Sequence, residues 1–137
     1  MLVMAARYEH IHKLILPKLR DGYYVICDRF VDSTACYQGL ASEIGTDKVF
    51  QLHQELMSNL MPDITFFINV ESTKALRRTL SRGNNNKFEA KNSEFHQQVS
   101  QSFQQLAERY SSRIVRIDAD ALDPQGVHHK VIQALSL

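Results

Sequence analysis

The fold is decided by residues 23–39, which read YYVICDRFVDSTACYQG. The stretch opens with apolar, β-branched and aromatic residues that do not alternate with polar ones, a pattern typical of a strand buried on both faces of a parallel sheet. Asp28 and Arg29 end this apolar run, and polar residues follow them. Ligands of open α/β sheets lie beyond the carboxyl ends of the strands. The sequence therefore predicts a strand over 23–27 with a binding site directly after it.

The residues after this strand suit a phosphorylated ligand. Arg29 carries a planar guanidinium whose donors match phosphate oxygens, and Asp28 could orient it or hold a metal-bound water. Hydroxyl and amide groups that could hydrogen-bond a nucleobase and a sugar follow on Ser33, Thr34, Tyr37 and Gln38. The alternative is a strand end with a local salt bridge between Asp28 and Arg29. The stretch alone does not decide between the two.

Helical and strand patterns alternate along the rest of the chain. We expect helices over 2–20, 46–60, 72–83, 92–110 and 123–135, and strands over 23–27, 64–70 and 114–117. Pro17 should kink the first helix or end its regular part, and Gly22 should close it. This order predicts an α/β fold, a parallel sheet flanked by helices. We expect one domain over 1–137.

Composition and charge argue against several classes of protein. A formal net charge of +1 over 137 residues predicts no strong field, so neither nucleic acid nor a membrane surface is an expected partner. No apolar run reaches the ~20 residues of a membrane span, and the first residues lack the layout of a signal peptide. Cys27 and Cys36 have neither the number nor the spacing of a disulfide framework or a zinc site. We expect a cytoplasmic protein with no metal-ligand cluster of its own.

The motif of residues 28–39, Asp-Arg-Phe-x-x-Ser-Thr-x-x-Tyr-Gln-Gly, follows a helix that carries Ala5-Ala6-Arg7. In this combination the chain resembles thymidylate kinase, over essentially its whole length. The resemblance implies the fold of the P-loop nucleoside monophosphate kinases. It also implies phosphoryl transfer from ATP to dTMP for the synthesis of dTTP, with Mg²⁺ bound to the ATP, by an enzyme that is a homodimer.

The resemblance assigns a role to each residue of the site. Arg7 would contact the thymine ring, although by its helix pattern alone it is a solvated charge. Val3 stands where the family usually has a Phe that stacks on the base, and Val cannot stack in that way. Arg29 would clamp the phosphate of dTMP, with Asp28 beside the metal and the phosphates. The nucleoside pocket would be lined by Ser33, Thr34, Tyr37 and Gln38.

A basic segment further along the chain resembles the lid of the family, whose arginines close over ATP. Arg78, Arg82 and Lys87 would stabilise the charge of the transferring phosphoryl group, a positional and electrostatic role. Lys87 stands where the family commonly has Arg, so it keeps the charge but loses the bidentate fork. The alternative is a basic helix face that ends in a polar loop.

The 137 residues contain no Gly-x-x-x-x-Gly-Lys-Ser/Thr, the loop with which such kinases cradle the donor phosphates. In thymidylate kinases this loop precedes the counterpart of Arg7. We therefore expect a chain that lacks the N-terminal strand and the phosphate loop, corresponds to the C-terminal two thirds of the family, and is inactive alone. Two alternatives stay open: another nucleotide or deoxynucleoside kinase of the same fold, and a non-catalytic nucleotide-binding remnant.

The resemblance also predicts how the strands are arranged. The family's N-terminal strand lies between the counterparts of 23–27 and 64–70. Neighbouring strands are about 4.8 Å apart, so these two segments should stand on the order of 10 Å apart. We expect 64–70 to pair on its other side with 114–117, and we expect the facing strand edges to favour self-association. Direct pairing of 23–27 with 64–70 would contradict this arrangement.

Overall fold

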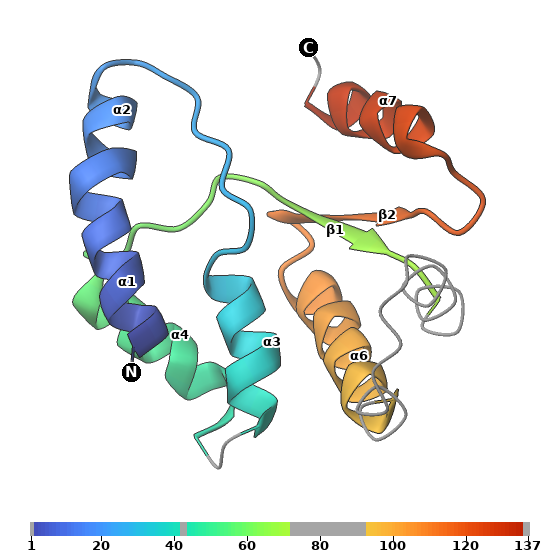
Figure 1. The fold of residues 1–137 in the computed structure, drawn as a ribbon, viewed down its shortest axis with the longest axis horizontal. Coiled ribbons are helices and arrows are strands. Elements are labelled where there is room, and N and C mark those ends of the chain that lie inside the picture. Colours follow the sequence, from blue (N-terminus) through green and yellow to red (C-terminus); the bar gives the residue numbers. More distant parts are fainter. Residues whose placement is uncertain (1, 42–43, 72–92, 136–137) are drawn as a thin grey trace, which may run out of the picture. The chain divides into compact units, whose positions relative to one another are not determined.

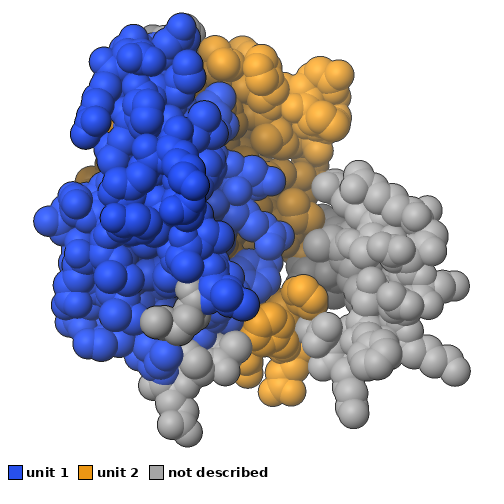
Figure 2. Space-filling view, turned by 60° about the vertical axis from the view of Figure 1, so that its left-hand side comes forward, with its two compact units in different colours: residues 1–61 blue, residues 62–137 orange. Residues whose placement is uncertain are grey.

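The computed structural model describes residues 2–41, 44–71 and 93–135. The chain divides into two compact units, Met1–Met61 and Pro62–Leu137, which have separate colours in Figure 2. The helix expected over 72–83 lies outside the described residues. The single domain expected over 1–137 stays a prediction.

The first unit begins with one long helix (Figure 1), whose winding changes near Pro17. It consists of α1 (Leu2–His10), a π-helical turn (Ile11–Ile15) and α2 (Leu16–Arg20). Proline has no N–H, and its ring crowds the carbonyl four residues earlier. The helix accommodates this with a wider turn, in which the Leu16 N–H donates to the Ile11 oxygen. The irregularity predicted at Pro17 is confirmed.

The end of α2 has the glycine termination that the sequence predicted. Gly22 has φ +83°, a left-handed conformation that glycine adopts without a steric penalty. Because the chain turns there, the Tyr23 N–H reaches back to the Lys18 carbonyl oxygen at 3.0 Å. This bond satisfies one of the carbonyls that a helix end leaves without a partner.

The buried face of this helix differs from the predicted one. The buried side chains are Met4, Arg7, Ile11 and Ile15. The spacing of apolar residues at three and four predicts a buried face that includes Leu2, Tyr8, Ile11 and Ile15, but Leu2 and Tyr8 are 87% and 45% exposed. The prediction is correct for Ile11 and Ile15 and wrong for Leu2 and Tyr8, because Arg7 was taken as a solvent-facing position, whereas it belongs to the inner face.

Residues 23–27 do not form the strand that the sequence predicted. A strand exists only where a neighbouring segment completes its ladder of hydrogen bonds, and no described segment does so here. Val25 packs against the core of the first unit, whereas Tyr24 and Ile26 are 94% and 99% exposed. The prediction of burial on both faces is therefore wrong.

Two further helices complete the first unit, α3 (Val31–Ala41) and α4 (Gly45–Leu56). They approach closely at Gly39, where an added Cβ would lie 3.0 Å from the Thr46 Cα. The inner side of α4 carries Val49, Phe50 and His53, and Met57 follows directly after the helix. Leu56, which the helical spacing of apolar residues over 46–60 puts on the inner face, is 48% exposed.

The core of the first unit joins the first helix to the end of α4. Ile11, Ile15 and Met57 form its buried cluster. Half-buried side chains pack against this cluster, namely Leu16, Val25, Phe30 and Leu60. Phe30 belongs to the Asp-Arg-Phe motif, so the core directly supports the start of α3.

The second unit is built on a parallel pair of strands (Figure 1). Strand β1 (Thr65–Asn69) pairs with β2 (Ile114–Asp118), in a register that sets Thr65 opposite Ile114 and Asn69 opposite Asp118. The predicted pairing of 64–70 with 114–117 is thus confirmed. The parallel sheet is flanked by the helices α6 (Ser93–Arg109) and α7 (Pro124–Ala134). The α/β prediction is correct.

Side chains of the second unit explain its local order. The Phe67 ring of β1 stacks on Phe103 of α6, with 5.3 Å between the ring centres. At the start of α7 the Asp123 carboxylate accepts from the Gly126 N–H at 2.7 Å. This is the cap that Asp123-Pro124 predicted, because a carboxylate before the first turn satisfies one of its free N–H groups.

Candidate functional site

Arg7 of α1 is 9% exposed and is bonded to the residues that begin α3. Its Nη2 donates to the Phe30 carbonyl oxygen at 3.2 Å and to the Thr34 hydroxyl. Its Nη1 donates to the Met4 sulfur at 3.3 Å, and its guanidinium carbon lies 5.1 Å from the centre of the Phe30 ring. Arg7 is therefore not a solvated charge. A guanidinium has more N–H donors than these contacts use, so within the described part of the chain Arg7 retains donors for a ligand.

Burial and nearby negative groups have opposite effects on the pKa of Arg7. Burial lowers the pKa of Arg7, whereas Cys27 in its thiolate form and the Asp32 carboxylate raise it. Arginine nevertheless stays protonated in proteins. Asp32 is 3% exposed, so a carboxylate and a guanidinium share the interior of this unit. A buried cation needs such compensation because desolvation penalises an isolated charge.

Cys27 lies in the same surroundings, but its thiol is poorly suited to nucleophilic chemistry. Burial raises the pKa of Cys27, Arg7 lowers it, and Asp28 raises it further. A thiol with a raised pKa remains protonated near neutral pH, and the thiolate is the reactive form. Nothing in the arrangement indicates covalent catalysis by Cys27.

Arg29 has an unusual backbone conformation. Its φ is +64°, in the left-handed region that costs a residue other than glycine on the order of 1–3 kcal/mol. Its carbonyl accepts from the Cys27 thiol at 3.6 Å, and its guanidinium carbon lies 5.2 Å from the centre of the Tyr37 ring. Strain of this kind clusters at functional sites. The conformation makes Arg29 a candidate residue of the site.

The alternative of a local salt bridge is wrong. Within the described ranges Asp28 and Arg29 form no ion pair with each other. Both residues are exposed. Their charged groups therefore remain accessible to a ligand.

Helix α3 brings the two arginines to one surface. Thr34, which binds Arg7, and Tyr37, which faces Arg29, are one turn apart on this helix. Residues at that spacing are neighbours on a helix surface. The structure thus gathers four of the predicted residues at the start of α3, each arginine held by one α3 side chain.

The remaining predicted residues are placed as follows. Val3 is 46% exposed on α1, one turn before Arg7. Ser33 is half-buried and Gln38 is exposed, both on α3. The predicted lid residues Arg78, Arg82 and Lys87 lie outside the described residues.

Sequence reasoning missed His53 and the structural part of Phe30 and Asp32. Phe30 supplies both a carbonyl and a ring face to Arg7. His53 is fully buried on α4, and its ring meets the Phe30 ring edge-on at 5.3 Å. The signal that could have found them is the Asp-Arg-Phe-x-Asp spacing, which puts an aromatic and a second carboxylate beside Arg29. For His53 the sequence offers no local signal.

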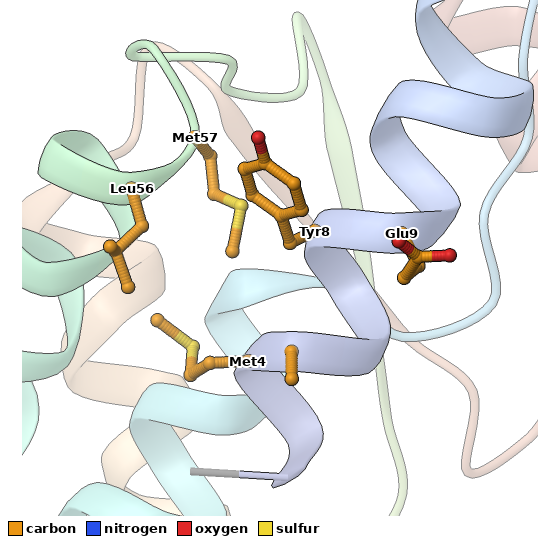
Figure 3. Close-up of a pocket in the computed structure, with 6 residues that line it drawn as sticks. Met4, Tyr8, Glu9, Leu56 and Met57 are labelled. Carbon is orange, nitrogen blue, oxygen red and sulfur yellow. The ribbon is translucent and has the colours of Figure 1, made fainter.

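A hollow of about 340 Å³ lies between α1 and the end of α4. It is lined by Met4, Ala5, Tyr8, Glu9, Leu56 and Met57. Figure 3 shows the Met4, Leu56 and Met57 side chains turned toward one another across it, with Tyr8 above and Glu9 directed away. None of the predicted site residues lines this hollow. Met4 lines the hollow and also accepts from Arg7, so the hollow adjoins Arg7 without including it.

The described residues were also considered for a metal site and for membrane-spanning helices. Among residues 2–41, 44–71 and 93–135, no group of three or more His, Cys, Asp and Glu side chains is placed to hold a metal ion. In the same ranges, every helix is too short or too polar to cross a membrane.

Comparison with known proteins gives one consistent result. A family model described as thymidylate kinase matches residues 1–131. A thymidylate kinase from Rickettsia typhi is 52% identical over 128 residues, which are 93% of this chain and 63% of that protein. One from Rickettsia bellii is 48% identical over 134 residues, which are 98% of this chain and 65% of that protein.

Solved structures agree with the sequence relatives. The crystal structure of thymidylate kinase from Ehrlichia chaffeensis matches with a TM-score of 0.74 and 32% sequence identity. The match covers 98% of this chain and 61% of that chain. The chain thus spans less than two thirds of the length of the relatives that it matches.

Proposed function

This chain belongs to the thymidylate kinase family, and from that membership we propose that it takes part in phosphoryl transfer from ATP to dTMP. Within that reaction it supplies the dTMP site and the lid. The observation that carries this proposal is Arg7, a buried cation held by Phe30 and Thr34 with donors still available. A buried guanidinium so oriented is preorganised to bind an acceptor group of a ligand.

The base of dTMP is assigned to the surface between α1 and α3. Arg7 donates to a carbonyl oxygen of thymine, and Val3, one turn earlier, covers part of the ring. Val3 offers less contact area than an aromatic side chain would. Polar side chains of α3 complete the nucleoside pocket, namely Ser33, Thr34, Tyr37 and Gln38.

The phosphate of dTMP is assigned to Arg29. Its guanidinium is exposed and is steadied by the Tyr37 ring, and its fork of donors can hold two phosphate oxygens at once. Positioning the acceptor oxygen in line with the donor phosphate is the main task of such an enzyme. The left-handed backbone of Arg29 is consistent with a side chain placed for this purpose.

A Mg²⁺ ion accompanies ATP in this proposal. Magnesium prefers oxygen ligands and keeps several waters, and the exposed Asp28 carboxylate fits such a water-mediated contact. When bound, the ion neutralises charge on the phosphates. Arg78, Arg82 and Lys87 would add positive charge around the transferring group, without a covalent intermediate.

Two alternatives differ from this proposal in the nucleotide that the protein binds or in whether it catalyses phosphoryl transfer. A kinase of the same fold for another nucleotide or deoxynucleoside would prefer a different base. A non-catalytic nucleotide-binding protein would bind dTMP but would show no kinase activity, even when the segment that only its longer relatives contain is added. From the resemblance we further propose a cytoplasmic location and a homodimer.

The direct test is an isothermal titration calorimetry experiment that measures the dissociation constants of dTMP, dCMP and dGMP for the purified 137-residue chain. We expect dTMP to bind more tightly than the other two. Because these residues contain no phosphate-loop sequence, we also expect no dTMP-dependent formation of ADP by this polypeptide alone. Equal binding of the three nucleotides, or none, would refute the assignment of the dTMP site. Robust turnover would show that another loop binds the donor phosphates.

A further inference from the structure

His53 is a fully buried histidine whose ring is only half satisfied. Its Nε2 lies 2.7 Å from the Leu60 carbonyl oxygen, and its Nδ1 has no hydrogen-bond partner in the described part of the chain. A carbonyl oxygen can only accept, so Nε2 carries the proton and Nδ1 is the bare nitrogen. This environment favours the neutral ring, because a second N–H at Nδ1 would be enclosed without an acceptor among the described residues.

A continuous series of contacts leads from this ring to Arg7. The His53 ring meets the Phe30 ring edge-on, with 5.3 Å between the centres. The Arg7 guanidinium lies over the Phe30 ring at 5.1 Å and also donates to the Phe30 carbonyl oxygen. Phe30 is thus held between a histidine from α4 and an arginine from α1.

We propose that His53 is a positioning residue for Arg7, which acts through Phe30 and does so only while the imidazole is neutral. The edge contact fixes the Phe30 ring, and the ring and carbonyl of Phe30 in turn fix the guanidinium. His53 itself touches no ligand in this account. Its influence on dTMP binding rests on the function proposed above, whereas its influence on Arg7 does not.

Acid should release this arrangement. A second proton on His53 would add an N–H with no acceptor and a positive charge that Arg7 repels. The charged groups of the described chain that act on His53 are Arg7 from α1 and Asp32 from α3, and the Leu60 carbonyl faces its other nitrogen. Burial lowers the pKa of His53 most, the Leu60 carbonyl and Asp32 raise it, and Arg7 lowers it. Protonated His53 and Arg7 would therefore repel each other in the interior of the unit.

The test is an NMR titration of the 137-residue chain from pH 7.5 to 5, which follows the His53 ring and the Arg7 Nε–Hε resonance. We expect His53 to titrate below the ordinary histidine range and the Arg7 resonance to shift with the same midpoint. His53→Gln keeps a donor for the Leu60 carbonyl but removes the ring and the titration. In this variant the Arg7 resonance should be displaced at pH 7.5 and should not vary with pH.

His10→Gln is the matched control, because His10 is an exposed histidine on α1. It should leave the Arg7 resonance and its pH dependence unchanged. An Arg7 resonance that ignores the titration of His53 in the unmodified chain would overturn the proposal. If acid unfolds the chain first, an undisplaced Arg7 resonance in His53→Gln at pH 7.5 would do the same.

A parallel dTMP titration separates this inference from the proposed function. If both hold, the dTMP dissociation constant rises as the pH falls through the His53 midpoint, and the His53→Gln variant loses that dependence. If dTMP does not bind at any pH while the Arg7 resonance still follows His53, the dTMP site is refuted and the positioning role stands.

Discussion

Arg7 on α1 donates directly to the Thr34 hydroxyl on α3, a residue 27 positions later in the chain. The same Nη2 donates to the Phe30 carbonyl oxygen. These bonds join the Ala-Ala-Arg helix to the Asp-Arg-Phe motif. The two motifs are therefore in direct contact in the folded chain.

The first prediction concerns this bond. Thr34→Val removes the acceptor of a buried Arg7 N–H at nearly constant volume, so it should lower the free energy of unfolding by about 1–3 kcal/mol. Thr34→Ser keeps the hydroxyl and should lose clearly less. Urea unfolding at pH 7.5 measures both. Equal losses in the two variants would show that the hydroxyl is not the stabilising feature.

The second prediction concerns the phosphate of dTMP. Arg29→Lys keeps the charge but replaces a planar fork with a single ammonium. Hydrogen bonds to charged groups contribute about 1.5–3 kcal/mol, so the dTMP dissociation constant should rise about tenfold or more. Arg20→Lys, at an exposed arginine that ends α2, is the control and should bind as the unmodified chain does. An unchanged dissociation constant for Arg29→Lys would exclude the phosphate clamp.

The third prediction concerns the pH dependence of stability. Because burial lowers the pKa of folded His53 below its ordinary value of 6.5, the unfolded chain binds the proton first as the pH falls. The contribution of His53 to stability is therefore present above pH 6.5 and is lost as the pH falls through the folded pKa.

Urea unfolding at several pH values between 7.5 and 5 measures this contribution. The free energy of unfolding should fall less steeply with acid in His53→Gln than in the unmodified chain, whereas His10→Gln should keep the full slope. A slope that is the same in all three chains would contradict the predicted role of His53.

The fourth prediction concerns the segment 23–27. Ile26 is 99% exposed, so Ile26→Lys should change the free energy of unfolding by no more than about 0.5 kcal/mol and should reduce self-association. Val25 packs against the buried cluster. Val25→Lys should therefore destabilise the chain by well over about 1 kcal/mol. Urea unfolding and analytical ultracentrifugation measure the two effects, and similar destabilisation by both variants would argue against the observed alternation.

Much of the local structure follows from the sequence alone. The alternation of helical and strand patterns predicts the α/β class, whereas the pairing of β1 with β2 was expected only from the resemblance to the thymidylate kinase family. Pro17, Gly22 and Asp123 place the π-helical turn, the end of α2 and the start of α7. These features are local, because each depends on one residue's own φ, its missing N–H or its side-chain acceptor.

The candidate site could be predicted only in part from the sequence. Asp28, Arg29 and the polar residues of α3 stand out because charged groups follow an apolar run. The burial of Arg7 and His53 could not be predicted from the sequence, since a charged or polar residue on a helix is ordinarily assigned to the solvent side. Only contacts across the fold, from Phe30 and Thr34, satisfy the buried guanidinium and so permit it.

The tertiary structure also decided the state of residues 23–27 and of Arg29. The sequence of 23–27 has strand character, but a strand requires a hydrogen-bonded neighbour, which no stretch of residues can specify by itself. The left-handed φ of Arg29 is likewise invisible in the sequence, because it is unfavourable for the residue in isolation. Sequence determined which groups this protein has for binding, and the fold determined which of them face one another.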